Sequence, residues 1–278
     1  MTLDGIARVL RDAGIPDARH EAVLLVERYE GESRAKILAD RAVGREYMSP
    51  ALAAAVEKRR TRYPLQYIFG EWEFMGLPFR VTENCLIPRA DTEVIAERAA
   101  SLLPENGRFL DLCTGSGCIA GALCRLTEDR RTTGAAVELV PETAELAREN
   151  LAALGYSDRC AVLTGDLSLA DGLFPAGDTF DVIVSNPPYV TADEMASLEP
   201  ELAFEPRVAL TDGGDGLSLI RAILALYGKR LRPGGAMVIE HGWRQGEAVR
   251  RMAEEYGYAY ASVLDYGGNT RGAELRKR

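Results

Sequence analysis

Phe109-Leu110-Asp111-Leu112-Cys113-Thr114-Gly115-Ser116-Gly117 is the segment that indicates the fold of this chain most strongly. Its first four residues have the character of a short buried strand, and its glycines indicate a turn. The apolar run from Ile119 to Leu126 that follows is typical of a helix. A strand, a glycine-rich turn and a helix bring backbone N–H groups close to a nucleotide-like ligand. The stretch therefore predicts an α/β protein with a Rossmann-like sheet and a nucleotide-type site at the end of this strand.

The rest of the C-terminal part repeats this pattern. From Asp91 onward, strand-like and helix-like segments alternate, which predicts a mostly parallel sheet. Asp91 itself is the expected N-cap of a helix over residues 92–103. The expected strands are residues 109–112, 135–138, 161–163, 180–184, 236–240, 259–264 and 272–276.

The N-terminal part has a different character. Residues 1–70 have almost no strand signals and are expected to form a small helical bundle. Residues 71–84 are expected to be a β-hairpin linker, which leaves residues 85–278 for the α/β domain. The basic cluster Lys58-Arg59-Arg60-x-Arg62 is expected to be a solvated helix face. The predicted helices of the bundle are residues 3–13, 18–29, 34–39 and 50–62.

Charge is unevenly distributed along the 278 residues, whose formal net charge is −9. Residues 1–80 carry 13 Lys and Arg against 12 Asp and Glu, whereas residues 81–278 carry 20 against 30. Binding to a phosphate backbone depends on cations, so we expect no direct nucleic-acid partner for the acidic part.

Cysteine and histidine usage indicates the compartment. The five cysteines include no Cys-x-x-Cys pair and the two histidines lie far apart, which predicts reduced thiols, a cytoplasmic location and no metal site. No apolar run approaches the length of a membrane span, so no membrane partner is expected.

Glu138 ends the expected strand 135–138, 21 residues beyond Gly117. This spacing is typical of a carboxylate that accepts hydrogen bonds from ribose hydroxyls. It fits both nicotinamide dinucleotide and S-adenosylmethionine, and Ala120 completes a glycine pattern that is also found in dinucleotide sites.

The charges around the turn favour one of these two cofactors. A pyrophosphate prefers helix N-termini and cations, whereas a sulfonium prefers carboxylates and carbonyl groups. Asp111, Glu138 and Asp166 all fall at expected strand ends, and no Lys or Arg lies between residues 110 and 123. The sequence therefore predicts S-adenosylmethionine.

Asn186-Pro187-Pro188-Tyr189 follows the expected strand 180–184. Two consecutive prolines end a strand because they cannot donate ladder hydrogen bonds. They leave a stiff turn with carbonyl oxygens, one amide and one ring at the sheet edge where ligands bind. Two acceptors and a ring suit a planar group with an NH2, so the turn predicts a methyl acceptor that is an amide or a base.

Together with these two turns, further segments resemble the PrmC/HemK family, the glutamine methyltransferases of class 1 peptide-chain release factors, over nearly the whole chain. The resemblance implies a seven-stranded methyltransferase sheet and methylation of the glutamine side-chain nitrogen in the GGQ loop of the factor. It also implies S-adenosylhomocysteine as product and a monomeric enzyme. The further segments are Tyr63–Gly70, Leu86–Glu93, Phe204–Leu210, Glu240–Gly246 and Asp265–Arg271.

The resemblance also assigns site residues. Asn186 would lie beside both the methyl donor and the acceptor, within a substrate site formed by Asn186, Pro187, Pro188 and Tyr189. The family often has Gly at position 113 and Pro at position 90, and the Cβ of Cys113 is expected to require a negative φ. The implied cofactor contacts are the backbone of Cys113, Thr114, Gly115, Ser116 and Gly117 with the methionine end, Glu138 with the ribose, and Asp166 and Leu167 with the adenine.

From this turn we expect a positioning mechanism. Asn186 Oδ1 and the Pro187 carbonyl would accept the two N–H bonds of the glutamine amide, while Tyr189 packs on the amide plane. The helical bundle would recognise the body of the release factor.

Four alternatives remain at this point. A methyltransferase for a ribosomal-protein glutamine shares nearly every motif, and an adenine amino-methyltransferase shares the Asn-Pro-Pro-Tyr turn. A nicotinamide oxidoreductase fits only the glycine turn and Glu138. A non-catalytic cofactor-binding module requires that the turn at Asn186 be blocked.

Overall fold

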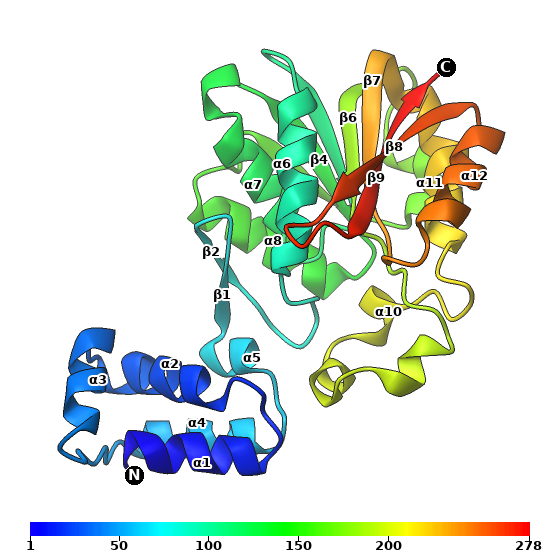
Figure 1. Ribbon diagram of the computed structural model, residues 1–278. Helices are drawn as coiled ribbons and strands as arrows, with labels where there is room; N and C mark the ends of the chain where they lie inside the picture. Colours follow the sequence, from blue (N-terminus) through cyan, green and yellow to red (C-terminus); the bar gives the residue numbers. More distant parts are fainter. The chain divides into compact units, whose positions relative to one another are not determined.

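The structure is a computed structural model that describes the backbone of residues 1–278 and the side chains of all of them except residues 170 and 171. The chain forms two compact units (Figure 1). The smaller unit comprises residues 1–71 and 199–204, and the larger one comprises residues 72–198 and 205–278.

The smaller unit is a helical bundle, as predicted. Thr2, Ser33 and Ser49 each accept a hydrogen bond from the backbone N–H three residues ahead, which caps three of its helices. The helices bury one apolar core, in which Ile6, Leu25 and Ile37 are fully enclosed. Helix α5 was not predicted, because its five residues are too few for a helical period to be recognised. The helices are α1 (Leu3–Asp12), α2 (Ala18–Glu30), α3 (Arg34–Arg41), α4 (Pro50–Arg60) and α5 (Leu65–Phe69).

Residues 199–204 belong to this helical unit although they are distant from it in sequence. Arg59 Nη2 lies 2.9 Å from Glu201 Oε1, and Arg62 Nη2 lies 2.5 Å from Glu201 Oε2. The ring of Phe204 packs edge-on against Tyr63. The expectation of a solvated basic face is therefore wrong for Arg59, which is 4% exposed and also pairs with Glu21.

A hairpin follows α5, as predicted. Strands β1 (Glu71–Phe74) and β2 (Leu77–Arg80) are joined by Met75 and Gly76, which both have positive φ values. Such two-residue turns match the twist of the two strands they connect.

The larger unit contains the predicted sheet. It has seven strands in the order β5-β4-β3-β6-β7-β9-β8, of which β9 runs antiparallel to both of its neighbours. All seven predicted strands are confirmed, and each is one to five residues longer than predicted. The strands are β3 (Arg108–Leu112), β4 (Thr133–Glu138), β5 (Cys160–Thr164), β6 (Phe180–Ser185), β7 (Leu231–Glu240), β8 (Tyr258–Leu264) and β9 (Thr270–Lys277).

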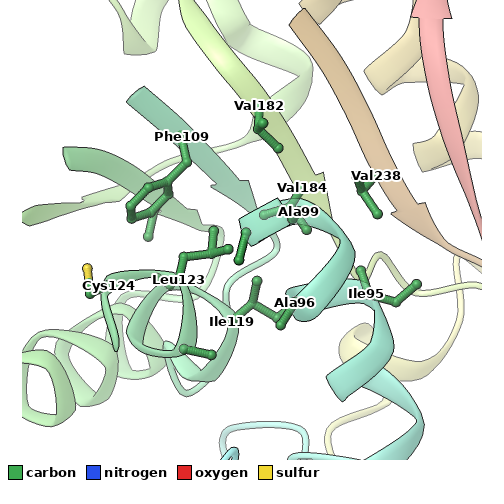
Figure 2. Close-up of a cluster of buried hydrophobic side chains, with 14 of the residues drawn as sticks. Ile95, Ala96, Ala99, Phe109, Ile119, Leu123, Cys124, Val182, Val184 and Val238 are labelled. Carbon is green, nitrogen blue, oxygen red and sulfur yellow. The ribbon is translucent and has the colours of Figure 1, made fainter. Parts of the chain in front are cut away.

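Helices cover both faces of this sheet, so each strand buries both sets of its alternating side chains. One face packs against α6 (Glu93–Leu102) and α7 (Cys118–Leu126), with α8 (Pro141–Ala153) beside them. The other face packs against α11 (Ser218–Tyr227) and α12 (Gly246–Glu255). Figure 2 shows the first core, where Ile95, Ala96, Ala99, Ile119 and Leu123 of the helices meet Phe109, Val182, Val184 and Val238 of the sheet.

The start of α6 differs from the prediction. Asp91 is not its N-cap, because the helix begins at Glu93 after the 3₁₀ turn Ala90–Thr92. The Asp91 carboxylate instead pairs with Arg271, a charged partner that is 180 residues away in sequence. The remaining short elements are α9 (Ala170–Leu173), α10 (Arg207–Leu210) and the 3₁₀ turns Glu128–Arg130, Leu167–Leu169, Glu194–Ser197, Pro200–Phe204 and Gly228–Arg230. Within the described chain, none of the helices has both the length and the apolar character that a membrane span needs.

Candidate active site

The sheet order brings the two turns together. Strands β3 and β6 are parallel neighbours, and Leu112 pairs with Ser185. The Ser185 hydroxyl donates to the Leu112 carbonyl at 2.7 Å, which ties the ends of the two strands. Cys113 and Asn186 therefore begin adjacent loops at the point where the strand order reverses, which is where open α/β sheets bind ligands.

Loops that follow β3, β4, β5 and β6 line one cavity. A narrower second cavity is lined by the segment before α6 and by the glycine turn, and Leu86, Cys113, Gly115 and Asn186 line both. The predicted site residues that line the first cavity are Cys113, Gly115, Glu138, Asp166, Leu167, Asn186 and Pro188, and Thr114 and Ser116 line the second. Among the described residues of the predicted site, Gly117, Pro187 and Tyr189 line neither.

The buried side chain of Asp111 fixes the conformation of the glycine turn through hydrogen bonds. Its Oδ2 accepts from the Thr114 hydroxyl at 2.5 Å and from the Ala120 backbone N–H at 3.1 Å, so it joins the turn to the first turn of α7. Asp111 is fully buried and lines neither cavity, so its role differs from the ligand contact that its position at a strand end suggested. Burial raises the pKa of Asp111 to about 7.

The backbone conformation of Cys113 differs from the expected one. Its φ is +61°, in the left-handed region, rather than negative. A side chain costs roughly 1–2 kcal/mol there relative to the right-handed region. The reason for this conformation is the sharp exit from β3, after which the Thr114 N–H donates to the Val137 carbonyl of the neighbouring strand at 3.1 Å. Gly115 and Gly117 also have positive φ values, which glycine adopts without this cost.

Glu138 lies at the end of β4 and lines the first cavity, as its spacing predicted. Its two oxygens accept from the backbone N–H groups of Gly115, at 2.9 Å, and Val140, at 3.1 Å. Burial raises the pKa of this carboxyl, and the backbone hydrogen bonds oppose that shift. These contacts place the carboxylate at the junction of two loops, where it can accept hydrogen bonds from hydroxyl groups of a ligand.

The Asn-Pro-Pro-Tyr turn is held at both ends. The Asn186 side-chain Nδ2 donates to Thr92 Oγ1 at 3.2 Å, and the Tyr189 hydroxyl donates to Glu240 Oε1 at 3.0 Å. Gln245 Nε2 donates to the Tyr189 carbonyl at 2.9 Å, and Gly216 lies so close that a Cβ there would be 2.1 Å from that carbonyl oxygen. These contacts make the turn rigid, and the Tyr189 hydroxyl is already hydrogen-bonded to Glu240.

The first cavity has a mixed apolar and acidic lining. Glu138 and Asp166 provide carboxylates, while Val137, Leu139 and Leu167 provide apolar walls, and the described lining residues of this cavity include no Lys or Arg. Apolar walls suit a flat ring, and carboxylates suit hydroxyl groups and a positive charge. These properties fit a cationic nucleoside better than a pyrophosphate.

Several lining residues were not predicted. Asn84, Cys85 and Leu86 come from the segment before α6, and Val208, Ala209 and Leu219 come from the chain after the Asn-Pro-Pro-Tyr turn. Leu86 and Val208 lie in segments that carried the family resemblance, which was the available signal for them. Asn84 and Leu219 had no sequence signal, because only the folded chain brings these segments to the sheet edge.

Two buried carboxyl groups are expected to make the stability of the folded protein depend on pH. Burial raises the pKa of both Asp111 and Glu240 to about 7, well above the value of an unfolded chain. The folded state then binds protons more tightly, so the contribution of these groups to stability is full below about pH 4 and is lost as the pH rises to about 7. We expect the free energy of unfolding of Asp111→Asn to change less with pH over this range.

The measurement is urea denaturation of the ligand-free protein at pH 5 and pH 8. The difference in unfolding free energy between the two pH values should be smaller in Asp111→Asn by on the order of 1–3 kcal/mol. An unchanged difference would mean that Asp111 is ionised throughout this range.

Comparisons with known proteins agree with the site. The family model described as the PrmC N-terminal domain matches residues 2–70, and that described as conserved hypothetical protein 95 matches residues 93–211. The release factor glutamine methyltransferase of Cereibacter sphaeroides is 44% identical over 220 residues, which cover 78% of this chain and 76% of that protein. The release factor glutamine methyltransferase of Salmonella typhimurium is 37% identical over 265 residues, which cover 94% of this chain and 92% of that protein.

A solved structure supports the fold alone. The crystal structure of a methyltransferase from Pyrococcus furiosus is similar with a TM-score of 0.54 and 18% identity, and covers 73% of this chain and 89% of that chain. The relative at 37% identity covers 94% of the chain and therefore most of both units described above. The chain belongs to the family of release factor glutamine methyltransferases.

Proposed function

We propose that the protein transfers a methyl group from S-adenosylmethionine to the side-chain nitrogen of a glutamine in class 1 release factors, in their GGQ loop. The observation that carries this proposal is the adjacency of the two turns: the glycine turn and Asn186 line the same two cavities. Methyl transfer requires the donor and the acceptor nitrogen to share one site. The names of the relatives supply the identity of the acceptor.

The first cavity suits the donor. Glu138 would accept hydrogen bonds from the ribose hydroxyls, and Leu139 and Leu167 would flank the adenine, with Asp166 close to its edge. The glycine turn would hold the methionine end through its backbone. S-adenosylmethionine supplies an electrophilic methyl carbon when bound, and the carboxylates of Glu138 and Asp166 favour its positive charge.

Asn186 and Pro187 would position the acceptor. An amide nitrogen is a weak nucleophile, because its lone pair is delocalised into the carbonyl group. Since Thr92 accepts a hydrogen bond from Asn186 Nδ2, the Oδ1 atom remains to accept an N–H of the substrate, and the Pro187 carbonyl would accept the other. Acceptors for both protons favour the positive charge that develops on nitrogen during transfer. That the Tyr189 ring packs on the substrate amide stays a prediction.

The test is methyl transfer from a labelled donor. Purified protein is incubated with labelled S-adenosylmethionine and, in separate reactions, with a class 1 release factor, ribosomal proteins and DNA. We expect label on the glutamine of the release factor, located by mass spectrometry of the GGQ peptide. Label on a ribosomal protein or on adenine, with none on the release factor, would overturn the proposal in favour of one of the alternatives.

The helical unit would recognise the body of the release factor. Deleting residues 1–70 should therefore lower methylation of intact factor by a larger factor than methylation of a short glutamine peptide. The comparison uses kcat/KM for both substrates, with cofactor binding by calorimetry as the control that the remaining unit is folded. Equal losses for the two substrates would contradict this role. A substrate that acts in translation also supports a cytoplasmic location, and we retain the monomer and the absence of a direct nucleic-acid partner as proposals.

A further inference from the structure

A chain of polar side chains leads from the methyl-acceptor site into the core of the larger unit. Asn186 Nδ2 donates to Thr92 Oγ1 at 3.2 Å, and the Thr92 hydroxyl also lowers the pKa of the Glu240 carboxyl, against the effect of burial. Thr92 and Glu240 are 2% and 1% exposed, so water does not compete for these bonds. None of these three residues is near another in sequence.

The Thr92 hydroxyl determines which groups donate and which accept in this series of polar contacts. A hydroxyl has one hydrogen and two lone pairs. An ionised carboxyl can only accept, so wherever Glu240 is ionised the Thr92 hydrogen points to Glu240 and its lone pairs are left for Asn186. The NH2 group of Asn186 faces Thr92 in the structure, which leaves Oδ1 for the cavity that Asn186 lines.

Amide orientation matters for the reaction, because the two orientations of Asn186 are nearly equal in shape but opposite in hydrogen bonding. With Oδ1 toward the cavity, Asn186 accepts an N–H of the substrate amide. With the orientation reversed, its NH2 group would meet the NH2 group of the substrate, and two donors would oppose each other.

Glu240 also contacts Tyr189, at the other end of the Asn-Pro-Pro-Tyr turn. Its Oε1 accepts from the Tyr189 hydroxyl at 3.0 Å, while its Oε2 is buried with no partner at ordinary hydrogen-bond geometry. Arg271 places a positive charge near both Tyr189 and Glu240, and it pairs with Asp91 next to Thr92. A fully buried carboxyl is costly unless such partners stabilise it. Its position at the end of β7, in contact with Tyr189 of the turn, indicates a role in the site.

We propose, on the basis of the function proposed above, that Thr92 and Glu240 are positioning residues that orient the Asn186 amide with its oxygen toward the substrate. They do not touch the substrate themselves in this arrangement. Their effect is on the fraction of enzyme molecules in which Asn186 presents an acceptor, which should change kcat more than the affinity for the release factor.

The experiment compares Thr92→Val with Thr92→Ser in the full-length protein. Valine has nearly the same shape as threonine but cannot accept from Asn186, whereas serine keeps the hydroxyl. With saturating S-adenosylmethionine and intact release factor, we expect Thr92→Val to lower kcat about tenfold, the scale of one oriented hydrogen bond, with KM changed less than about twofold. Thr92→Ser should keep kcat within about twofold of the wild type.

Thr127→Val is the matched control. Thr127 is also fully buried and its hydroxyl donates to the Leu123 carbonyl, but it caps the far end of α7 and lines neither cavity. It should keep the wild-type kcat even if it unfolds at a lower temperature. Glu240→Gln replaces the carboxyl by a neutral amide that can also donate, and we expect a kcat between those of the wild type and Thr92→Val.

The outcomes separate the two proposals. A wild-type kcat in Thr92→Val, or a kcat in Thr92→Ser as low as in Thr92→Val, would overturn the orienting role while the proposed function stands. Equal losses of kcat in Thr92→Val and Thr127→Val would also overturn it, because they would reflect stability alone. A wild-type protein that transfers no methyl group to the release factor refutes the proposed function and the orienting role with it.

Discussion

Replacing Asn186 with alanine should lower kcat for methylation of the release factor by at least ~100-fold, the scale observed when one catalytic hydrogen-bonding group is lost. The physical reason is that Asn186 Oδ1 is the side-chain acceptor which its bond to Thr92 leaves directed at the cavity. Without it, the substrate amide keeps at most the backbone acceptor of Pro187. Its nitrogen is then no longer held in one position relative to the methyl donor.

This prediction is checked by single-turnover methyl transfer with intact release factor. Cofactor affinity, measured by calorimetry, should change by no more than a few fold, because Glu138 and the glycine turn are untouched in this variant. Unfolding temperature provides the control for structure. Methylation by Asn186→Ala at close to the wild-type rate would remove Asn186 from the catalytic assignment.

Replacing Glu138 with alanine should raise the dissociation constant for S-adenosylmethionine by at least ~100-fold. Two hydrogen bonds from hydroxyl groups to a buried carboxylate are expected to contribute roughly 1.5–3 kcal/mol each. The carboxylate also favours the positive charge of the donor. Part of the loss would come from the protein itself, because Glu138 holds the backbone N–H groups of Gly115 and Val140.

Two further variants distinguish these contributions. Glu138→Gln keeps an acceptor for one hydroxyl and should lose about tenfold in affinity. Glu142→Gln removes a carboxylate in the exposed first turn of α8 and should bind the cofactor as the wild type does. S-adenosylhomocysteine, which lacks the positive charge, should lose less affinity than S-adenosylmethionine in Glu138→Gln. Wild-type affinity in Glu138→Ala would place the ribose elsewhere.

Much of the fold was predictable because its signals are local. The alternation of strands and helices, the glycines after β3 and the prolines after β6 each act within a few residues of chain, so they can be recognised without neighbours. The same holds for Glu138, whose spacing from Gly117 reflects one strand-turn-helix-strand unit. The positions of all seven strands were predicted for this reason.

Other features depended on residues distant in sequence. Asp91 has the residue type of an N-cap, but its carboxylate pairs with Arg271, and the helix begins at Glu93, one residue later than predicted. Arg59 was expected in solvent, but Glu201 provides a partner and Arg59 is buried. Cys113 has a positive φ because the neighbouring strand β4 accepts the next N–H group.

The α/β architecture, the two turns and the preference for a cationic cofactor could be predicted from the amino-acid sequence without neighbouring segments. This was possible because backbone conformation and charge are properties of the residues themselves. The folded chain was needed to show that Asn186 contacts Thr92, 94 residues away, and that Tyr189 contacts Glu240, 51 residues away. Those pairs follow from the order of strands in the sheet. A buried hydrogen bond needs both partners in place, and no single segment of the chain contains both.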